Sequence, residues 1–307
     1  MMILSIDIGG TRIKSAVMNE NAQILKQSDV PSPRSSESEL MQTMQEIIRT
    51  NQAGVQGIAV CMPGKIDPGR GMVLGAGSFP FLKDYPLAER LSALSGLPVS
   101  LCNDGKSAAA AELWQGSMKG IRNGLVYVIG TAIGGGIIIN GEVLNGPHFL
   151  AGELSNILID KTRRGFSLDN IAARQGGSYG MLLNYRQKTG STDMIDGREF
   201  FRRLEAGEAA AKNVFEDFCR FTAANLLSLQ TVLDLERVAI GGGISAQPAV
   251  TDGIREALRE LFTDLRKVSH TGTAEPEIVR CRFGNDANLI GALWFFLNKA
   301  KEANGFL

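Results

Sequence analysis

The fold is decided by the stretch Ile3-Leu-Ser-Ile-Asp7-Ile8-Gly9-Gly10-Thr11. Its first half is almost wholly apolar and predicts a buried strand with one carboxylate near its end. The glycines and Thr11 predict a tight turn, and the alternation of apolar and polar residues over 13–18 predicts a second strand. A further turn at 19–22 and a strand over 24–30 complete a predicted three-stranded meander.

The same pattern restarts in the middle of the chain. Residues 125–129 predict a strand, 130–136 form a glycine-rich turn, and 137–140 predict a second strand that ends in the hairpin pair Asn140-Gly141. This similarity to residues 3–30 predicts an internal repeat, in which two structural halves each begin with strand, Gly/Thr turn and strand.

Helices and strands alternate elsewhere, which is typical of an α/β fold with sites at strand ends. A capping box of Ser36 and Glu39 precedes a helical apolar period that runs to Ile48. We expect further helices at 87–95, 107–115, 208–234, 249–261 and 287–299, and further strands at 57–62, 99–102 and 237–240. Residues 157–196 are the least readable, with one helical stretch expected near Ile171, and are typical of a segment that serves a substrate or a partner subunit.

Bulk properties restrict the function classes. A chain of 307 residues usually forms two domains. Its 32 basic and 32 acidic residues cancel, so no charge excess attracts nucleic acid or a membrane surface. The apolar runs have strand length and the N-terminus carries no basic leader, so we expect a cytoplasmic protein without a membrane span.

The cysteines stand singly at 61, 102, 219 and 281, and the chain has only two histidines. This spacing favours neither a disulfide framework nor a zinc site. We expect four small, buried, apolar side chains.

Each of three glycine clusters, at 9–10, 130–136 and 241–243, follows an apolar strand. There the backbone can approach a ligand and direct N–H groups at it, so three clusters favour a polyphosphate ligand. The alternative is that each merely supplies the dihedral angles of a turn. Asp7 would hold Mg²⁺, directly or through water, next to the phosphates, unless its carboxylate only caps the turn.

Asn103-Asp104 stands where a strand ends and before a helix. Phosphoryl transfer to an alcohol needs a group that accepts the hydroxyl proton, and Asp104 near a helix N-terminus suits that task, with Asn103 available for neighbouring hydroxyls. Asp104 could equally be the N-cap of the helix, and the residues alone leave both interpretations open. Gly152-Glu153 is a second candidate for sugar hydroxyls, or a surface charge.

Several motifs occur in order along the chain. They are Asp7-Ile-Gly-Gly-Thr-Arg-Ile13, Pro63-Gly-Lys-Ile-Asp67, Leu97-Pro-Val with Asn103-Asp104, Gly130-Thr-Ala-Ile-Gly-Gly-Gly136, Gly152-Glu153 and Gly241-Gly-Gly-Ile244. Over nearly the whole chain they resemble the motifs of the ROK family of sugar kinases and repressors. The resemblance implies an actin-like (ribonuclease H-like) ATPase fold of two lobes, with ATP and sugar in an interlobe cleft, and usually a homodimer.

The resemblance also implies lobe boundaries and residue roles. We expect a small lobe of residues 1–104 plus 287–307 and a larger lobe of 105–286 with the adenosine loop and the dimer surface. Asp104 would be the catalytic base and Asp7 the Mg²⁺ residue. The sugar would contact Gly64, Asn103, Asp104, Glu153 and Asn156. The nucleotide would contact Asp7, Gly9, Gly10, Thr11, Arg12, Thr131, Gly134, Gly135, Gly242 and Gly243.

Departures from the family pattern refine this expectation. Asn156 stands where many members have a histidine, and no cysteine-rich motif follows, so we expect no zinc. ATP and Mg²⁺ remain the expected cofactors. The chain is most similar to the zinc-free branch that includes β-glucoside kinases and N-acetylmannosamine kinases. Ala132 replaces an expected glycine and would oppose the phosphate turn if its backbone had a positive φ.

The predicted function is an ATP-dependent sugar kinase acting on a hydroxyl, the 6-hydroxyl, of a hexose or β-glucoside. The alternative is a non-catalytic sugar sensor or a transcription regulator of the same family. Such repressors carry an N-terminal DNA-binding helical segment, whereas this sequence begins at the Asp7 strand without a basic patch. Which sugar is used depends on a few hydroxyl contacts that a sequence does not display.

Overall fold

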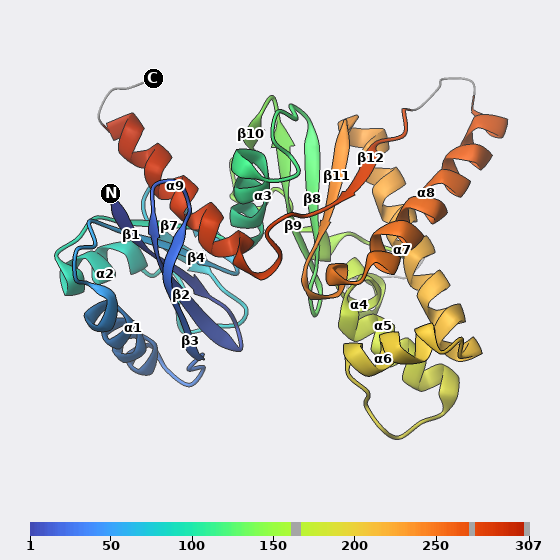
Figure 1. Ribbon diagram of the computed structural model, residues 1–307, viewed down its shortest axis with the longest axis horizontal. Coiled ribbons are helices and arrows are strands. Elements are labelled where there is room, and N and C mark those ends of the chain that lie inside the picture. Colours follow the sequence, from blue (N-terminus) through green and yellow to red (C-terminus); the bar gives the residue numbers. More distant parts are fainter. Residues whose placement is uncertain (161–166, 270–273, 304–307) are drawn as a thin grey trace. The chain divides into compact units, whose positions relative to one another are not determined.

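The computed structural model describes residues 1–160, 167–269 and 274–303 of the chain, with side chains as far as Lys299. The chain divides into two compact units. The first unit consists of Met1–Lys119, Val143–Ala151 and Asn285–Leu307, and the second of Gly120–Glu142 and Gly152–Gly284. Figure 1 follows the chain through both.

A five-stranded sheet forms the centre of the first unit. Its strands lie in the order β3 (Ile24–Pro31), β2 (Arg12–Asn19), β1 (Met2–Ile8), β4 (Ile58–Met62) and β7 (Val99–Asn103). β1 pairs antiparallel with β2 and parallel with β4, and β4 pairs parallel with β7. The predicted meander and the predicted strand, turn and strand around Gly9-Gly10 are confirmed. A small hairpin of β5 (Lys65–Asp67) and β6 (Met72–Gly75) follows β4.

The residues of β1 alternate between two faces, as the period of a strand requires. Leu4, Ile6 and Ile8 belong to a core that includes buried side chains of α1 (Glu37–Asn51) and α2 (Leu87–Ser95). Ser5 and Asp7 point to the other face, where Ser5 Oγ donates to Leu289 O of α9 (Ala287–Ala303) at 2.5 Å. Asp7 therefore lies on the α9 face of the sheet.

Helix α9 packs closely on α3 (Asp104–Gln115) in the first unit because small residues line the contact. A Cβ added to Gly291 would lie 1.7 Å from Ser107 O, which excludes any larger residue there. α3 contributes the buried run Ala108–Ala111. The tight pairing fixes the start of α3, and with it the position of Asp104 relative to the sheet.

The second unit repeats the sheet of the first. Its strands lie in the order β10 (Glu142–Val143), β9 (Ile133–Ile139), β8 (Gly124–Ile129), β11 (Arg237–Gly241) and β12 (Glu277–Arg280). β8 pairs antiparallel with β9 and parallel with β11, and β11 pairs parallel with β12. The internal repeat predicted from the sequence is confirmed.

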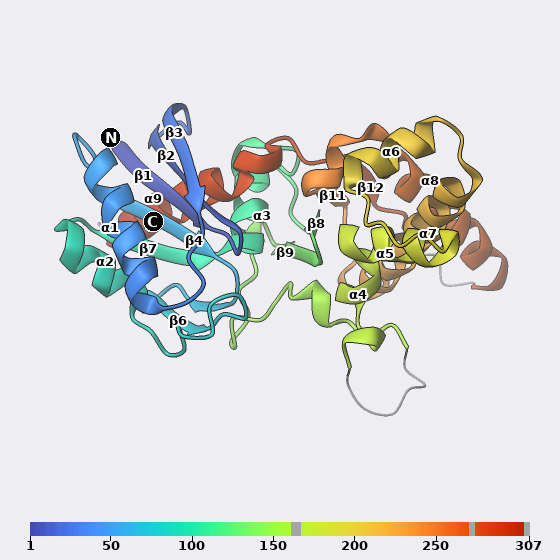
Figure 2. The same cartoon turned by 90° about the horizontal axis from the view of Figure 1, so that it is seen from below.

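Helices α7 (Ala209–Leu233) and α8 (Pro248–Val268) share one core with the sheet of the second unit. α5 (Ser178–Thr189) contacts both α4 (Ala172–Gly176) and α6 (Gly197–Glu205), and Figure 2 shows α4 and α5 side by side with α6 apart from α4. The prediction of a single helical stretch near Ile171 was incomplete, because α5 and α6 were missed. Short 3-10 helices occur at Leu154–Asn156, Leu168–Asn170, Gly243–Ala246 and Gly284–Asp286.

Further predictions can be compared with the structure. α3 begins at Asp104, so the expected start near Ser107 was wrong by most of a turn. In the division by contacts α3 lies in the first unit, whereas the predicted lobes were separated at residue 104. All four cysteines are free and buried, as expected. Within the described part of the chain, no helix has the length and apolar character that crossing a bilayer demands.

Candidate active site

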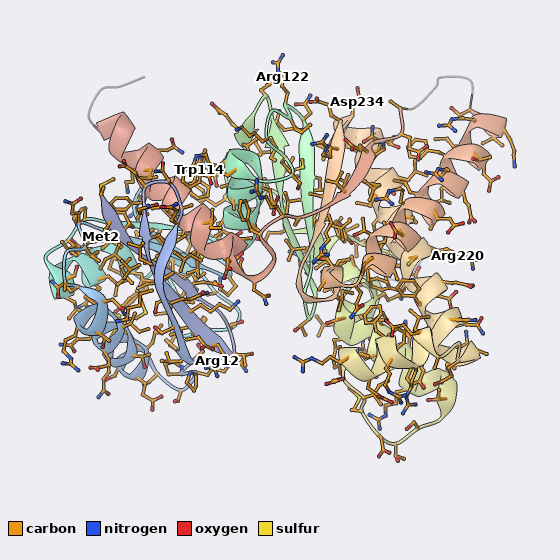
Figure 3. The ribbon with its side chains drawn as sticks, viewed as in Figure 1. Met2, Arg12, Trp114, Arg122, Arg220 and Asp234 are labelled. Atoms are coloured by element: carbon orange, nitrogen blue, oxygen red, sulfur yellow. The ribbon has the colours of Figure 1, made fainter. Side chains whose placement is uncertain are left out.

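The first glycine turn joins β1 to β2 in the first unit. Gly9 N donates to Arg12 O at 3.0 Å, and a Cβ on Gly9 would lie only 2.8 Å from that oxygen. Thr11 O accepts from Ser32 N at 3.0 Å. Arg12 is exposed and pairs with Asp29 across the β2–β3 hairpin, where Figure 3 labels it. The turn is therefore tight, with the Thr11 hydroxyl and the Arg12 side chain near the surface.

Asp7 is only 6% exposed at the end of β1. Asn288 Nδ2 donates to its Oδ2 at 3.2 Å, and Cys61 Sγ donates to its Oδ1 at 3.7 Å. Burial raises the pKa of Asp7, while the charge of Lys14 and the two hydrogen bonds act in the opposite direction. The two groups that donate to Asp7 belong to β4 and α9. The Gly9 N–H of the turn donates to Arg12 O and not to Asp7. The alternative that Asp7 caps the turn was therefore wrong.

Two side chains that the sequence analysis did not single out lie beside this turn. Arg34 Nε donates to Gly10 O. A Cβ on Gly10 would lie 3.0 Å from Arg34 Nη2 and 3.2 Å from Ser78 Oγ, so both groups approach the glycine from one side. Arg34 is exposed, and none of the ion pairs among the described residues includes it. Because position 10 is glycine, the Arg34 guanidinium and the Ser78 hydroxyl both have room beside the turn.

Asn103 and Asp104 follow β7 directly. Asn103 is the N-cap of α3, because its Oδ1 accepts from Lys106 N at 3.0 Å, and its Nδ2 donates to Gly64 O at 3.0 Å. Asp104 is the first residue of the helix, and its Oδ1 accepts from Gly105 N at 2.8 Å. The alternative that Asp104 itself is the N-cap was therefore wrong. The structure brings Gly64, Asn103 and Asp104 together in the first unit.

Gly64 needs to be glycine. Its φ is +118°, a value that residues other than glycine rarely adopt, and an added Cβ would lie 2.4 Å from Gly75 O. The loop after β4 can therefore approach the hairpin formed by β5 and β6. This close approach presents Gly64 O to the Asn103 amide.

The second glycine turn joins β8 to β9 in the second unit. Gly130 N donates to Ala132 O at 2.9 Å, and Ser178 donates to Gly130 O through both its N–H and its Oγ, each at 2.9 Å. The N-terminus of α5 thus lies on the turn. Ala132 is not among the residues with positive φ, so its Cβ does not strain the turn.

Space around this turn differs from residue to residue. A Cβ on Gly135 would lie 2.2 Å from Val126 O of the neighbouring strand, whereas one on Gly134 would meet nothing within 4 Å. Gly152 packs on Gly135, since its own Cβ would lie 3.1 Å from Gly135 O. The structure therefore places half-buried Glu153, next in the chain, near the second turn. Asn156, at the end of the following 3-10 helix, is exposed.

The third glycine turn follows β11. Gly242 has φ +91°, and a Cβ there would lie 2.1 Å from Ile129 O, whereas a Cβ on Gly243 would meet nothing within 4 Å. Gly243 borders a cavity of about 340 Å³ within the second unit. Its other lining residues are Ser178, Leu182, Asp196, Gly197, Arg198, Phe201, Ile244 and Gln247. That size and this mixture of apolar and polar groups suit a small ligand such as a nucleoside.

Most of this cavity was not predicted from the sequence, because its lining residues on α5 and α6 belong to helices that we did not expect. The start of α6 carries the only recognisable signal, since Asp196 caps it by accepting from Glu199 N at 2.8 Å. Among the described residues, no group of three or more His, Cys, Asp or Glu side chains could hold a metal. Asp7 is therefore not part of such a group.

Comparison with known proteins supplies the family. The family model described as "ROK family" matches residues 3–299. The chain is 30% identical over 304 residues to a β-glucoside kinase of Klebsiella pneumoniae, covering 96% of each chain. It is 28% identical to an N-acetylmannosamine kinase of Yersinia pseudotuberculosis, covering 95% of this chain and 97% of the relative.

One of the most similar solved structures has the same fold. A ROK family protein from Streptococcus pneumoniae, crystallised with sucrose, is 30% identical and superposes with a TM-score of 0.86. The match covers 98% of this chain and 100% of that one. The actin-like ATPase fold is therefore established for this chain.

Proposed function

The chain belongs to the ROK family, and from that premise we propose that it is an ATP-dependent sugar kinase that phosphorylates the 6-hydroxyl of a hexose or β-glucoside. The observation that carries the proposal is the position of Asp104 at the first residue of α3. There it directly follows Asn103, whose amide donates to Gly64 O, and the favourable end of the helix dipole stabilises the negative charge of Asp104. The relatives named for β-glucoside and N-acetylmannosamine support this class of substrate.

In this proposal Asp104 accepts the proton of the sugar hydroxyl as that oxygen attacks phosphorus. The Asn103 amide is already fixed by its two hydrogen bonds, so it presents a constant orientation to a bound sugar. Glu153 and Asn156 would contact further hydroxyls. Their side chains can form several hydrogen bonds each, which suits neighbouring hydroxyls of one ring.

The glycine turns fit a nucleotide. Open space at Gly134 and Gly243, and the cavity that Gly243 borders, leave room for phosphate oxygens and an adenosine. Gly9, Gly10, Thr11, Arg12, Thr131, Gly135 and Gly242 would complete the nucleotide contacts. Bound ATP would supply the phosphoryl group, and Mg²⁺, held by Asp7 directly or through water, would neutralise its oxygens.

The buried state of Asp7 is compatible with this task. A desolvated carboxylate has a strong preference for a counter-charge, and a divalent cation supplies one. Asn288 and Cys61 orient both carboxylate oxygens from the α9 face. Dimer formation, a cytoplasmic location and independence from zinc stay predictions.

The test is a coupled assay of ATP consumption with purified protein and Mg²⁺. Glucose, N-acetylmannosamine, mannose, fructose and cellobiose are supplied one at a time, and the position of the phosphate in each product is read by NMR. We expect rapid turnover with at least one of them and a 6-phosphate product. Sugar binding in calorimetry without any ATP turnover would instead identify a non-catalytic sugar sensor.

A further inference from the structure

A buried lysine lies two residues after the proposed base. Lys106 is only 2% exposed, although it carries an ammonium group. Lysine is almost never buried to this extent unless its charge is satisfied by partners. Lys106 lies in the first turn of α3, and its Nζ donates to Phe149 O at 2.8 Å.

The carbonyl that Lys106 holds belongs to an unusual turn. Phe149 has φ +60°, a left-handed conformation that is costly for a bulky residue. Phe149 N donates to Gly146 O at 3.1 Å, and Ala151 N donates to Asn145 O at 3.3 Å. The segment 145–151, which we call the Phe149 loop, is thus a compact turn in which the left-handed Phe149 needs outside support.

The Phe149 loop leads directly into Gly152-Glu153, the pair assigned above to the sugar. The opposite end of Lys106 is equally constrained, because its backbone N–H donates to Asn103 Oδ1. One residue therefore connects the Asn103 cap, and so the start of Asp104's helix, with the loop that precedes Glu153. Both contacts lie within the first unit.

We propose that Lys106 is a positioning residue for the sugar, whose buried ammonium holds the Phe149 loop in its left-handed turn and thereby sets the affinity for the carbohydrate but not for the nucleotide. The inference rests on the proposed kinase function. In it, Lys106 acts through the loop and takes no part in the chemical step. Its role is to keep the loop closed so that the residues of the sugar site need no ordering when the sugar binds.

The experiment compares Lys106→Met with Lys106→Arg and with Lys299→Met. Lys106→Met keeps most of the apolar stem and removes the charge and its donors, whereas Arg keeps a cation. Lys299 is a matched control, since its Nζ also donates to a carbonyl of the first unit, Pro68 O at 3.3 Å, but on an exposed side chain. Steady-state kinetics give KM for sugar and for ATP, and calorimetry gives sugar binding without ATP.

We expect Lys106→Met to raise the sugar KM and the sugar Kd about tenfold, the scale of one hydrogen bond to a charged donor, with the ATP KM unchanged within twofold. Lys106→Arg should recover part of the loss, and Lys299→Met should match the wild type. If Lys106 had a purely structural role, Lys106→Met would lower Tm and weaken the binding of sugar and of ATP together. That result would overturn the inference. Equal sugar affinity in Lys106→Met and wild type overturns it as well.

The two proposals fail in distinguishable ways. If the wild type turns over no ATP with any sugar but binds one in calorimetry, the kinase function fails while the Lys106 comparison by calorimetry still decides the positioning role. If Lys106→Met is insoluble, Lys106→Arg supplies the comparison. An unchanged sugar Kd in that variant, together with a displaced Phe149 loop in its crystal structure, overturns the inference.

Discussion

The two halves of the chain share one sheet topology but differ in what stands at their strand ends. Asp7 precedes the first glycine turn by two residues, and Val128 occupies the same place before the second. β7 ends in Asn103 and is followed by Asp104, whereas its counterpart β12 is followed by Cys281. Backbone geometry has been kept in both halves, while carboxylates occur at these positions only in the first.

This difference indicates how the work is divided in the proposed reaction. The first half holds the groups that carry or accept charge, Asp7 and Asp104. The second half offers glycines and hydroxyls around open space, together with the cavity beside Gly243. Substitution of Asp104 should therefore change turnover, and substitution of Gly243 should change nucleotide affinity.

The largest effect is expected at Asp104. Asp104→Asn removes the proton acceptor but keeps the size and most of the hydrogen bonding, so turnover should fall at least about a hundredfold. Sugar binding by calorimetry should stay within a few-fold of the wild type. Near-normal turnover in this variant would refute the assignment of the base.

The third glycine turn offers a matched pair in the second half. Gly242→Ala forces a Cβ to within 2.1 Å of Ile129 O at φ +91°, which should cost about 1–3 kcal/mol of stability and lower Tm. Gly243→Ala meets nothing within 4 Å, so Tm should not change while the KM for ATP rises because the methyl group enters the nucleotide's space. A normal ATP KM for Gly243→Ala would remove Gly243 from the site.

Arg34 tests whether the first half also contributes to phosphate binding. Arg34→Ala should raise the KM for ATP about fivefold, at the low end for a charge-assisted hydrogen bond because the side chain is exposed. Arg49→Ala is the control, since Arg49 is exposed in the same unit but pairs with Glu46. Identical ATP KM values for both variants would assign Arg34 to the turn's structure alone.

The smallest effect is on stability as a function of pH. Because burial raises the pKa of Asp7, the folded state binds this proton more tightly than the unfolded state does. The contribution of Asp7 to stability is then most favourable at low pH and is lost as the pH rises from the ordinary value of 3.8 through the raised pKa. Thermal unfolding without Mg²⁺ should show the wild type losing stability relative to Asp7→Asn over that window. A constant difference would contradict the cause given for the shift.

Much of the fold could be predicted because local patterns determine it. The Ile3–Ile8 strand, its glycine turn and their repetition after residue 125 depend on neighbours in sequence, and the structure has them where expected. The start of α3 was misplaced because Asn103 and Asp104 are both good capping residues, and only the hydrogen bond from Lys106 N identifies Asn103 as the cap.

The rest depends on contacts that a sequence does not display. α5 was missed because Gly177 and Gly180 interrupt its start and its apolar residues lack a helical period. Arg34 at Gly10 and Lys106 at Phe149 join residues far apart in the chain, and no local pattern indicates either pair. The predicted roles of the site residues themselves await the experiments above.

Helix α9 has a consequence for how the protein is made. It supplies Leu289 O to Ser5 and Asn288 to Asp7, and it covers one face of a sheet whose first strand leaves the ribosome nearly three hundred residues earlier. During translation that face stays without its cover until α9 is synthesised. The first unit therefore cannot complete its fold before α9 has been made, and its uncovered sheet face is open to aggregation until then.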